Sequence, residues 1–248
     1  MKGFFILGAM VAALAGCATK QDDSLPVYLF LGQSNMVGMR SVPADLPADM
    51  RAEQPLALFF KGGAWLPLSA GVTEPKGFGP EISFSHEMAR EGREFGLIKV
   101  SAGATTLAKE WSPTNPDGLY AKTIAQVEAA KRTRHIKVAG VLWMQGESDG
   151  QTAEMAAAYK ANLKQFISAI RYDTGSDDAP FAVCRVTSPE SQFPYTSQVR
   201  KAQEKVSASN YRWFDCDSLT RGPDNLHYDT SGQIRLGVKF ADALKSMR

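Results

Sequence analysis

This sequence predicts a single α/β domain, with a mostly parallel five-stranded sheet between two layers of helices. Two observations predict it. Short apolar runs alternate with amphipathic stretches along most of the 248 residues, and 44% apolar with 22% charged residues is typical of a globular chain. Strands that alternate with helices form a parallel sheet, and right-handed crossovers place helices on both faces. We therefore expect a doubly wound, three-layer sandwich.

The strands are expected in short, mostly apolar runs. The run from Pro26 to Leu31 is apolar throughout and ends at Gly32, which is typical of a strand buried on both faces. The other four runs are Leu97–Val100, Val138–Trp143, Phe181–Val186 and Tyr211–Phe214.

Helices are expected between these strands. The strongest apolar stripe at helical spacing consists of Met155, Tyr159, Leu163, Phe166, Ile167 and Ile170. The other expected helices are Ile82–Phe95, about Tyr120–Lys131, about Tyr195–Ser207 and about Ser231–Met247. The stretch from Arg40 to Pro80 is rich in Pro and Gly, so we expect surface loop with one hairpin near Leu56 to Leu68.

The amino terminus has the features of an export signal. A basic start precedes an apolar run from Phe4 to Leu14, which is too short for a permanent membrane span. The segment Leu14–Cys17 resembles the lipobox of bacterial lipoproteins, which implies that Cys17 is lipidated. Cleavage nearby without lipid is the alternative.

The expected organisation is a signal peptide over residues 1–17, a polar tether over 18–25 and one domain over 26–248. We expect the domain outside the cytoplasm, held at a membrane by its lipid. Ala18 is not the Asp that often retains lipoproteins at the inner membrane, which favours the outer membrane.

Charge and cysteine content exclude several other classes. A net charge of +2 provides too weak a field for nucleic acid to be the main partner. No group of His and Cys has metal-ligand spacing. An oxidising compartment would permit a disulfide between Cys184 and Cys216, but we expect buried free thiols, because pairing needs a specific Cα spacing.

Polar clusters follow several of the expected strands. They are Gly32–Gly38, Ser101–Gly103, Gln145–Asp149 and, beyond the last strand, Asp224–His227. Ligands of open α/β sheets bind at the carboxyl ends of strands, so we expect these clusters to meet in one site.

A serine nucleophile in this site would need a histidine base, and the chain has three histidines. His135 precedes a strand and would lie at the opposite edge of the sheet. His86 falls within an amphipathic helix, where a partly buried structural role is expected. His227 follows Asp224 by three positions, so the carboxylate can accept from Nδ1 and leave Nε2 for a serine.

Ser34 is the candidate nucleophile. It does not lie in Gly-x-Ser-x-Gly, because Met36 occupies the position of the second glycine, which argues against an α/β-hydrolase elbow. An N-cap at the start of a helix would also explain a serine here. The two interpretations are compatible, since a helix start offers backbone N–H groups to an anion.

At these residues the sequence resembles the SGNH hydrolase clan, which has a flavodoxin-like fold. It is most similar to the branch of family 6 acetylxylan esterases and sialate O-acetylesterases. Five blocks carry the resemblance in the family's order: Gly32–Gly38, Gly79–Phe84, Ala102–Leu107 with Trp111, Trp143–Asp149, and Asp224–His227 with Gly232 to Gly237. The departures are Met144, where the family often has His, and Ala104, where a second Gly is frequent.

The resemblance implies a role for each matching residue. Ser34 would be the nucleophile, His227 the general base and Asp224 the acid that orients it. The backbone N–H groups of Ser34 and Gly103, with the side chain of Gln145, would form the oxyanion hole, where each donor contributes about 3 kcal/mol.

Glu147 is the alternative acid, because the family's Glu at this block is sometimes assigned a catalytic role. We favour Asp224. Glu81 and Trp111 are expected to anchor loops near the rim of the pocket.

The implied activity is that of a serine O-acetyl esterase acting on acetylated xylan or sialic-acid-type carbohydrate through an acetyl-Ser34 intermediate. No metal or organic cofactor is expected, and the oligomeric state stays open. A same-clan lipase or thioesterase with longer acyl preference is one alternative, and a lipid-anchored glycan-binding module without activity is another.

Overall fold

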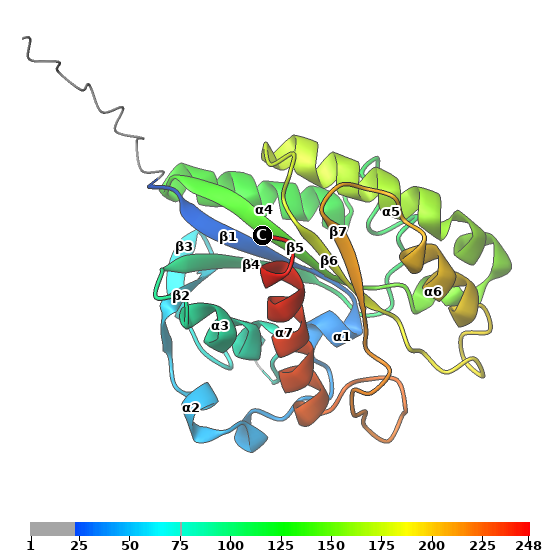
Figure 1. Ribbon diagram of the computed structural model, residues 1–248, viewed down its shortest axis with the longest axis horizontal. Helices are drawn as coiled ribbons and strands as arrows, with labels where there is room; N and C mark the ends of the chain where they lie inside the picture. The colour runs from blue at the N-terminus through cyan, green and yellow to red at the C-terminus, as the bar shows by residue number, and fades with distance from the viewer. Residues whose placement is uncertain (1–22, 75) are drawn as a thin grey trace, which may run out of the picture.

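A computed structural model describes residues 23–74 and 76–248 of the protein (Figure 1). Within them the sheet has seven strands in the order β3-β2-β4-β1-β5-β6-β7. All neighbours pair in parallel except β2 with β3. The strands are β1 (Leu25–Gly32), β2 (Gln54–Lys61), β3 (Ala64–Leu68), β4 (Phe95–Ser101), β5 (Ile136–Met144), β6 (Phe181–Arg185) and β7 (Tyr211–Asp215).

The α/β class and all five expected strands are confirmed, but the expected number of strands is wrong by two. The extra strands are β2 and β3, which form the hairpin expected near Leu56 to Leu68. Residues Ala57–Phe59 of β2 pair in parallel with β4, so the hairpin extends the sheet instead of lying on the surface. Phe59 and Phe60 are 5% and 3% exposed, and their burial explains why the hairpin joins the sheet.

Helices cover both faces of the sheet (Figure 1). α4 (Leu119–Thr133) and α5 (Ala153–Thr174) lie on one face with α6 (Thr196–Glu204) beside α5, and α3 (Glu81–Ala89) and α7 (Thr230–Lys245) lie on the other. Short helical segments are α1 (Ser34–Val37), α2 (Ala48–Arg51), η1 (Pro43–Asp45) and η2 (Ser148–Gln151). The expected helix over Ile82–Phe95 ends at Ala89 in the structure, because the chain turns at Gly92, whose φ is 71°, before Phe95 begins β4.

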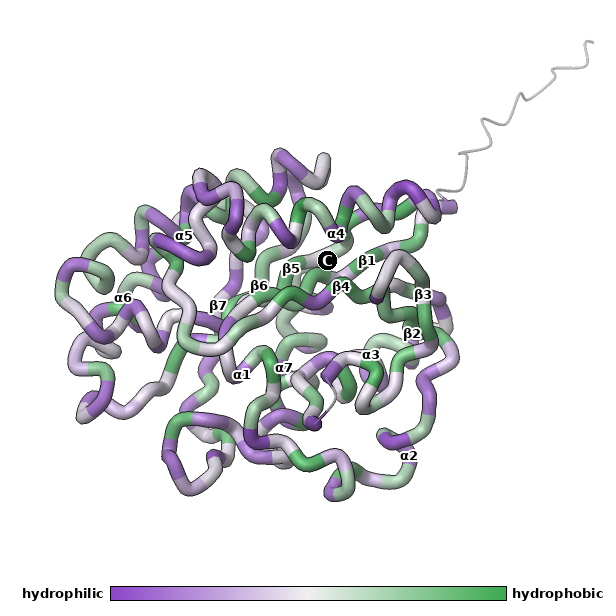
Figure 2. The backbone as a smooth tube through the Cα atoms, turned by 180° about the vertical axis from the view of Figure 1, so that it is seen from behind, coloured by the Kyte–Doolittle hydropathy of each residue, from purple (hydrophilic) through white to green (hydrophobic). Residues whose placement is uncertain are grey.

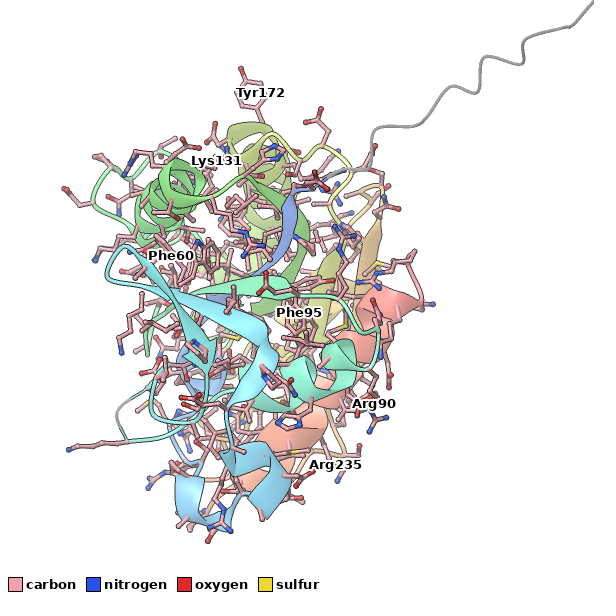
Figure 3. The ribbon with its side chains drawn as sticks, turned by 90° about the vertical axis from the view of Figure 1, so that its left-hand side faces the viewer. Phe60, Arg90, Phe95, Lys131, Tyr172 and Arg235 are labelled. Atoms are coloured by element: carbon pink, nitrogen blue, oxygen red, sulfur yellow. A yellow bond between two sulfur atoms is a disulfide. The ribbon has the colours of Figure 1, made fainter. Side chains whose placement is uncertain are left out.

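The core lies between the sheet and these helices. Most residues of the central strands β1 and β5 are hydrophobic (Figure 2). In α5 the expected stripe is buried from Tyr159 to Ile170, whereas Met155 is half-buried. Tyr172, four-fifths exposed, points outward from the same helix (Figure 3). The periodicity therefore identified the buried face of α5 correctly.

Cys184 and Cys216 form a disulfide, so the expectation of free thiols is wrong. β6 and β7 are neighbours, and Cys184 pairs in register with Phe214 while Cys216 directly follows β7. This register places the two Cα atoms 6.0 Å apart, within the range that a disulfide requires. The adjacency of the two strands decided the pairing.

The expected signal peptide, Cys17 and most of the tether lie outside the described residues. The tether was expected to extend to Leu25, but Ser24 is already buried and Leu25 opens β1. Among the described residues, no helix is both long and apolar enough to cross a membrane.

Candidate active site

Three of the predicted polar clusters meet at the carboxyl ends of β4, β1 and β5. These strands are neighbours, with β1 in the middle. From β1, the strands β4 and β2 lie on one side and β5, β6 and β7 on the other, so the direction in which strands are added to the sheet reverses at β1. Crevices at such reversals are the usual ligand sites of open α/β sheets. The fourth cluster, Asp224–His227, joins them from the loop between β7 and α7.

Gly32 allows the chain to turn sharply from β1 into α1. Its φ is 157°, and a Cβ there would lie 2.1 Å from the carbonyl oxygen of Met144. Gln33 N–H donates to the same carbonyl at 2.9 Å, so the turn stays attached to β5. Only glycine permits this close approach.

Ser34 is the first residue of α1 and is 4% exposed. Its carbonyl accepts from the N–H groups of Gly38 and Met39, which holds the turn closed. The serine is therefore fixed by backbone bonds at the end of the central strand. Its side chain lines a cavity of about 220 Å³ that His227 and Gly103 also line.

The Asp224 carboxylate holds His227 in place. Oδ2 of Asp224 lies 3.0 Å from Nδ1 of His227, and Oδ1 accepts from the backbone N–H groups of Leu226 and His227 at 3.1 and 2.9 Å. An ionised carboxylate only accepts hydrogen bonds, so Nδ1 carries the proton and Nε2 is left as the base.

Asp224 stays ionised well into the acid range. Burial alone would raise the pKa of this carboxyl, but hydrogen bonds from the backbone and ring of His227, from Leu226 and from Arg40 together hold it well below its usual range. The Nε–H of Arg40 donates to Oδ2 at 2.9 Å, and the stem of Arg40 packs beside Gly222.

Asn35 connects α1 to the segment that carries His227. Its amide donates to Glu147 Oε1 at 2.9 Å and to the carbonyl of Leu226 at 3.2 Å, and its side-chain oxygen accepts from Tyr228 N–H at 2.9 Å. These bonds hold the residues on both sides of His227 against the helix that begins with Ser34.

Glu147 accepts one of the hydrogen bonds of Asn35 and is 1% exposed. Its Oε2 has no hydrogen-bond partner among the described residues. Burial raises the pKa of Glu147, while its hydrogen bond from Asn35 and the nearby His227 act in the opposite direction. Asp224, and not Glu147, is the carboxylate at Nδ1 of His227.

Gly103 lies beside the serine. A Cβ at Gly103 would be 3.9 Å from the Cβ of Ser34 and 3.5 Å from Sδ of Met39, so a glycine leaves this side of the cavity open. Ala102 N–H donates to the carbonyl of Gly32 at 3.2 Å, which ties this loop to the end of β1.

Gln145 does not reach the cavity as predicted. Its amide nitrogen has two N–H groups, and these donate to the carbonyl of Thr105 at 2.8 Å and to Asp149 Oδ2 at 2.6 Å. Its oxygen accepts from the Tyr159 hydroxyl at 3.2 Å. The side chain is fully buried and has no free donor for an oxyanion, so it supports the loop of Gly103 instead.

Asp149 completes this support. Both of its oxygens lie 3.1 Å from Leu107 N–H. Burial raises the pKa of Asp149 to about 6, although the hydrogen bonds from Gln145 and Leu107 lower it. Trp111 Nε1 donates to Thr105 Oγ1 at 3.0 Å, so this fully buried ring anchors the same loop from the core, beneath the expected rim.

A match to a family model covers residues 24–246, and its description is "Carbohydrate esterase, sialic acid-specific acetylesterase". This chain belongs to that family. A probable carbohydrate esterase of Arabidopsis thaliana is 27% identical over 241 residues, which cover 89% of this chain and 90% of the relative. The resemblance to the sialate O-acetylesterase branch and the assignment as a carbohydrate esterase are thereby confirmed.

Solved structures agree with this carbohydrate esterase in fold. A crystal structure of an Arabidopsis thaliana protein superposes with a TM-score of 0.80 at 24% identity, covering 90% of this chain and 98% of that one. A carbohydrate acetylesterase from Xanthomonas citri superposes with a TM-score of 0.68 at 17% identity, covering 90% and 56%.

Ala104 is one of the two departures from the family pattern. Ala104 has a φ of 56°, in the left-handed region that glycine adopts without strain. The backbone conformation at this position therefore favours the glycine that the family pattern often has.

Glu81 is the expected anchor, because its carboxylate accepts from Gly79 N–H, Thr73 Oγ1 and Lys99 Nζ.

The other two histidines lie where the sequence placed them. His135 is exposed and precedes β5, and His86 is half-buried within α3.

Several residues that line the cavity at Ser34 could not be recognised from the sequence. These are Met39, Gln151 and Phe193, which come from separate segments of the chain. Asn35 was inside a recognised block, but its role depends on contacts with residues more than a hundred positions away.

Proposed function

We propose that this carbohydrate esterase is a serine O-acetyl esterase that removes acetyl groups from sugars through an acetyl-Ser34 intermediate. One observation carries the proposal. Ser34 and His227 line the same cavity, and the Asp224 carboxylate lies 3.0 Å from Nδ1 of that histidine. A nucleophile, a base and the group that orients the base are the parts that acyl transfer needs.

In the acylation step, Nε2 of His227 takes the proton of the Ser34 hydroxyl while Oγ attacks the acetyl carbonyl carbon. The carbonyl oxygen becomes an oxyanion, for which we assign the backbone N–H groups of Ser34 and Gly103 as donors. When the tetrahedral intermediate collapses, the bond to the sugar oxygen breaks. His227 gives its proton to that oxygen, so a free sugar hydroxyl leaves.

Deacylation repeats these steps with water. His227 takes a proton from a water molecule, the hydroxide oxygen attacks acetyl-Ser34, and the oxyanion is held by the same donors. The bond to Oγ then breaks and the serine regains its proton from His227. Acetic acid is released, and it ionises in neutral solution.

Acetylated xylan and sialic-acid-type sugars are the proposed substrate classes. The cavity at Ser34 is lined in part by Ala104, Phe193 and Leu226. These apolar side chains suit the methyl group of an acetyl ester. A lipase or thioesterase of the same clan would favour longer acyl chains.

The first experiment is hydrolysis of p-nitrophenyl acetate by the full chain and by Ser34→Ala. We expect kcat of the variant to fall by a factor of roughly 10⁴ or more, because the variant lacks the hydroxyl that forms the acetyl-enzyme. The matched control is Ser148→Ala, since Ser148 lines the same cavity and should retain most of the activity. Turnover that survives Ser34→Ala would refute the assignment of the nucleophile.

A second experiment decides the substrate class. We expect acetate release from acetylated xylan or O-acetylated sialic acid, and falling kcat/KM as the acyl chain of p-nitrophenyl esters lengthens from acetate to octanoate. A rising series would favour the lipase alternative. Binding of these glycans with no acetate release would favour a non-catalytic module.

A further inference from the structure

A second cavity, of about 320 Å³, adjoins the cavity at Ser34. It is lined by Val37, Gly38, Met39, Glu74, Lys76 and Gly77. Met39 lines both cavities, and its side chain is 56% exposed. A methionine has three rotatable bonds and adapts readily to what lies beside it. The two cavities therefore share an unbranched, adaptable side chain in their lining, next to the nucleophile.

An acetylated sugar has an apolar methyl group at one end and hydroxyl groups at the other, and the linings of the two cavities differ in a corresponding way. The lining of the Ser34 cavity includes the apolar residues Phe193 and Leu226, whereas the lining of the second cavity includes the charged residues Glu74 and Lys76 beside Val37 and Met39. A carboxylate accepts hydrogen bonds from hydroxyl groups and an ammonium group donates to them. The second cavity therefore offers hydrogen-bonding groups to an alcohol that carries further hydroxyls.

The Glu74 carboxylate is oriented by a buried cation. Lys99 Nζ lies 3.5 Å from Glu74 Oε1, and the Lys99 side chain is only 2% exposed. The same ammonium group bonds to Glu81 Oε1 at 3.0 Å and to the carbonyl of Val37 at 3.2 Å. Because Val37 is the last residue of α1, this ion cluster fixes Glu74 relative to the helix that begins with Ser34. Such preorganisation reduces the entropy cost of binding.

We propose that the second cavity binds the sugar alcohol of the substrate while the acetyl group occupies the Ser34 cavity. Glu74 accepts and Lys76 donates hydrogen bonds to hydroxyl groups of the sugar ring. Met39 lies between the sugar and the ester carbonyl. This assignment rests on the proposed esterase function and names the residues that would give it preference for sugars.

The test compares two acetate esters whose alcohols differ in hydroxyl groups. One is a mono-acetylated methyl xyloside, and the other is p-nitrophenyl acetate, whose alcohol has no further hydroxyl. We expect Glu74→Gln and Lys76→Ala each to lower the ratio of kcat/KM for the xyloside to that for the aryl ester by roughly 10-fold, chiefly through KM, because Glu74→Gln loses the charge of the acceptor and Lys76→Ala loses the charged donor. Lys122→Ala, an exposed lysine of α4 outside both cavities, is the matched control.

Each result supports or overturns the assignment. A ratio that stays constant while both values fall would show that Glu74 only maintains the fold, and a ratio that stays constant with both values intact would place the sugar elsewhere. Either outcome overturns the second cavity as the sugar site but leaves the esterase proposal standing. If the wild-type chain hydrolyses neither ester, the proposed function itself fails, and the sugar site fails with it.

Discussion

At the scale of single residues, the site depends on which carboxylate holds His227. Asp224 contacts the ring of His227 and also accepts from two backbone N–H groups, whereas Glu147 accepts a side-chain hydrogen bond from Asn35. The two acidic groups therefore have different tasks. Asp224 sets the tautomer of the base, and Glu147 holds the amide that clamps the neighbouring backbone.

Substituting each carboxyl group by its amide separates these tasks. We expect Asp224→Asn to lower kcat by a factor of about 10³ to 10⁴, since an amide can stabilise the wrong tautomer of His227. Glu147→Gln should cost roughly 10-fold, because its amide oxygen can still accept from Asn35. Steady-state kinetics on p-nitrophenyl acetate would measure both. A larger loss in Glu147→Gln than in Asp224→Asn would make Glu147 the acid of the triad.

Wild type and Asp224→Asn also test how the charge of Asp224 affects stability. The pKa of Asp224 is lower in the folded protein than its ordinary value, so the ionised carboxylate stabilises the fold above about pH 4, and that stabilisation is lost as the pH falls further. In urea unfolding, we expect the difference in free energy of unfolding between wild type and Asp224→Asn to be smaller at pH 3 than at pH 7. An unchanged difference would mean that the charge of Asp224 adds no stability.

At the scale of elements, the contact between α7 and α3 positions the carboxyl-terminal part of the site. α7 begins three residues after His227, and α3 begins at Glu81, whose carboxylate holds Lys99 beneath α1. Gly237 lies where the two helices meet. A Cβ there would be 2.1 Å from Ser83 Oγ and 2.2 Å from the carbonyl oxygen of Pro80.

Adding one methyl group at this contact should therefore separate the helices. We expect Gly237→Ala to lower the free energy of unfolding by about 1–3 kcal/mol, the usual cost of overpacking, even though alanine favours helices. Urea denaturation followed by circular dichroism would measure it. Arg235→Ala, at an exposed position of the same helix (labelled in Figure 3), should change stability by less than about 0.5 kcal/mol. Equal stability of Gly237→Ala and wild type would contradict the close packing.

At the scale of the whole molecule, the disulfide joins the last two strands at one end of the sheet. Cys184 and Cys216 are fully buried, and Tyr228, the neighbour of His227, has its hydroxyl 3.8 Å from Cys184 Sγ. The bridge thus connects the edge of the sheet to the segment that carries the base. It closes a loop with a sequence separation of 32 residues.

Removing this bridge should destabilise the whole fold. For a loop of this length, we expect Cys184→Ala with Cys216→Ala to lower the free energy of unfolding by about 3–4 kcal/mol, chiefly because the unfolded chain gains freedom. Urea denaturation of the oxidised wild type and the double variant would measure the loss. If peptide mapping of the unreduced wild type finds both thiols free, the bridge does not form.

Much of this molecule could be predicted from its sequence, because the relevant forces act between close neighbours along the chain. Short, mostly apolar runs located β1, β4, β5, β6 and β7, and helical spacing located the buried face of α5. Asp224 and His227 lie three positions apart, so their hydrogen bond needs only a local loop. The ordered blocks of the family, beginning at Gly32–Gly38, indicated the esterase fold and Ser34.

Only the tertiary structure decided which distant segments meet. The donors of Gln145 are taken by Thr105 and Asp149, so the sequence could not show that its amide is withheld from the cavity. The register of β6 with β7 paired two cysteines, and burial of Phe59 and Phe60 placed a hairpin in the sheet. Local pattern determined the elements and the chemistry at their ends, because both depend on adjacent residues. Which distant residues share hydrogen bonds or pack together could be seen only in the folded chain.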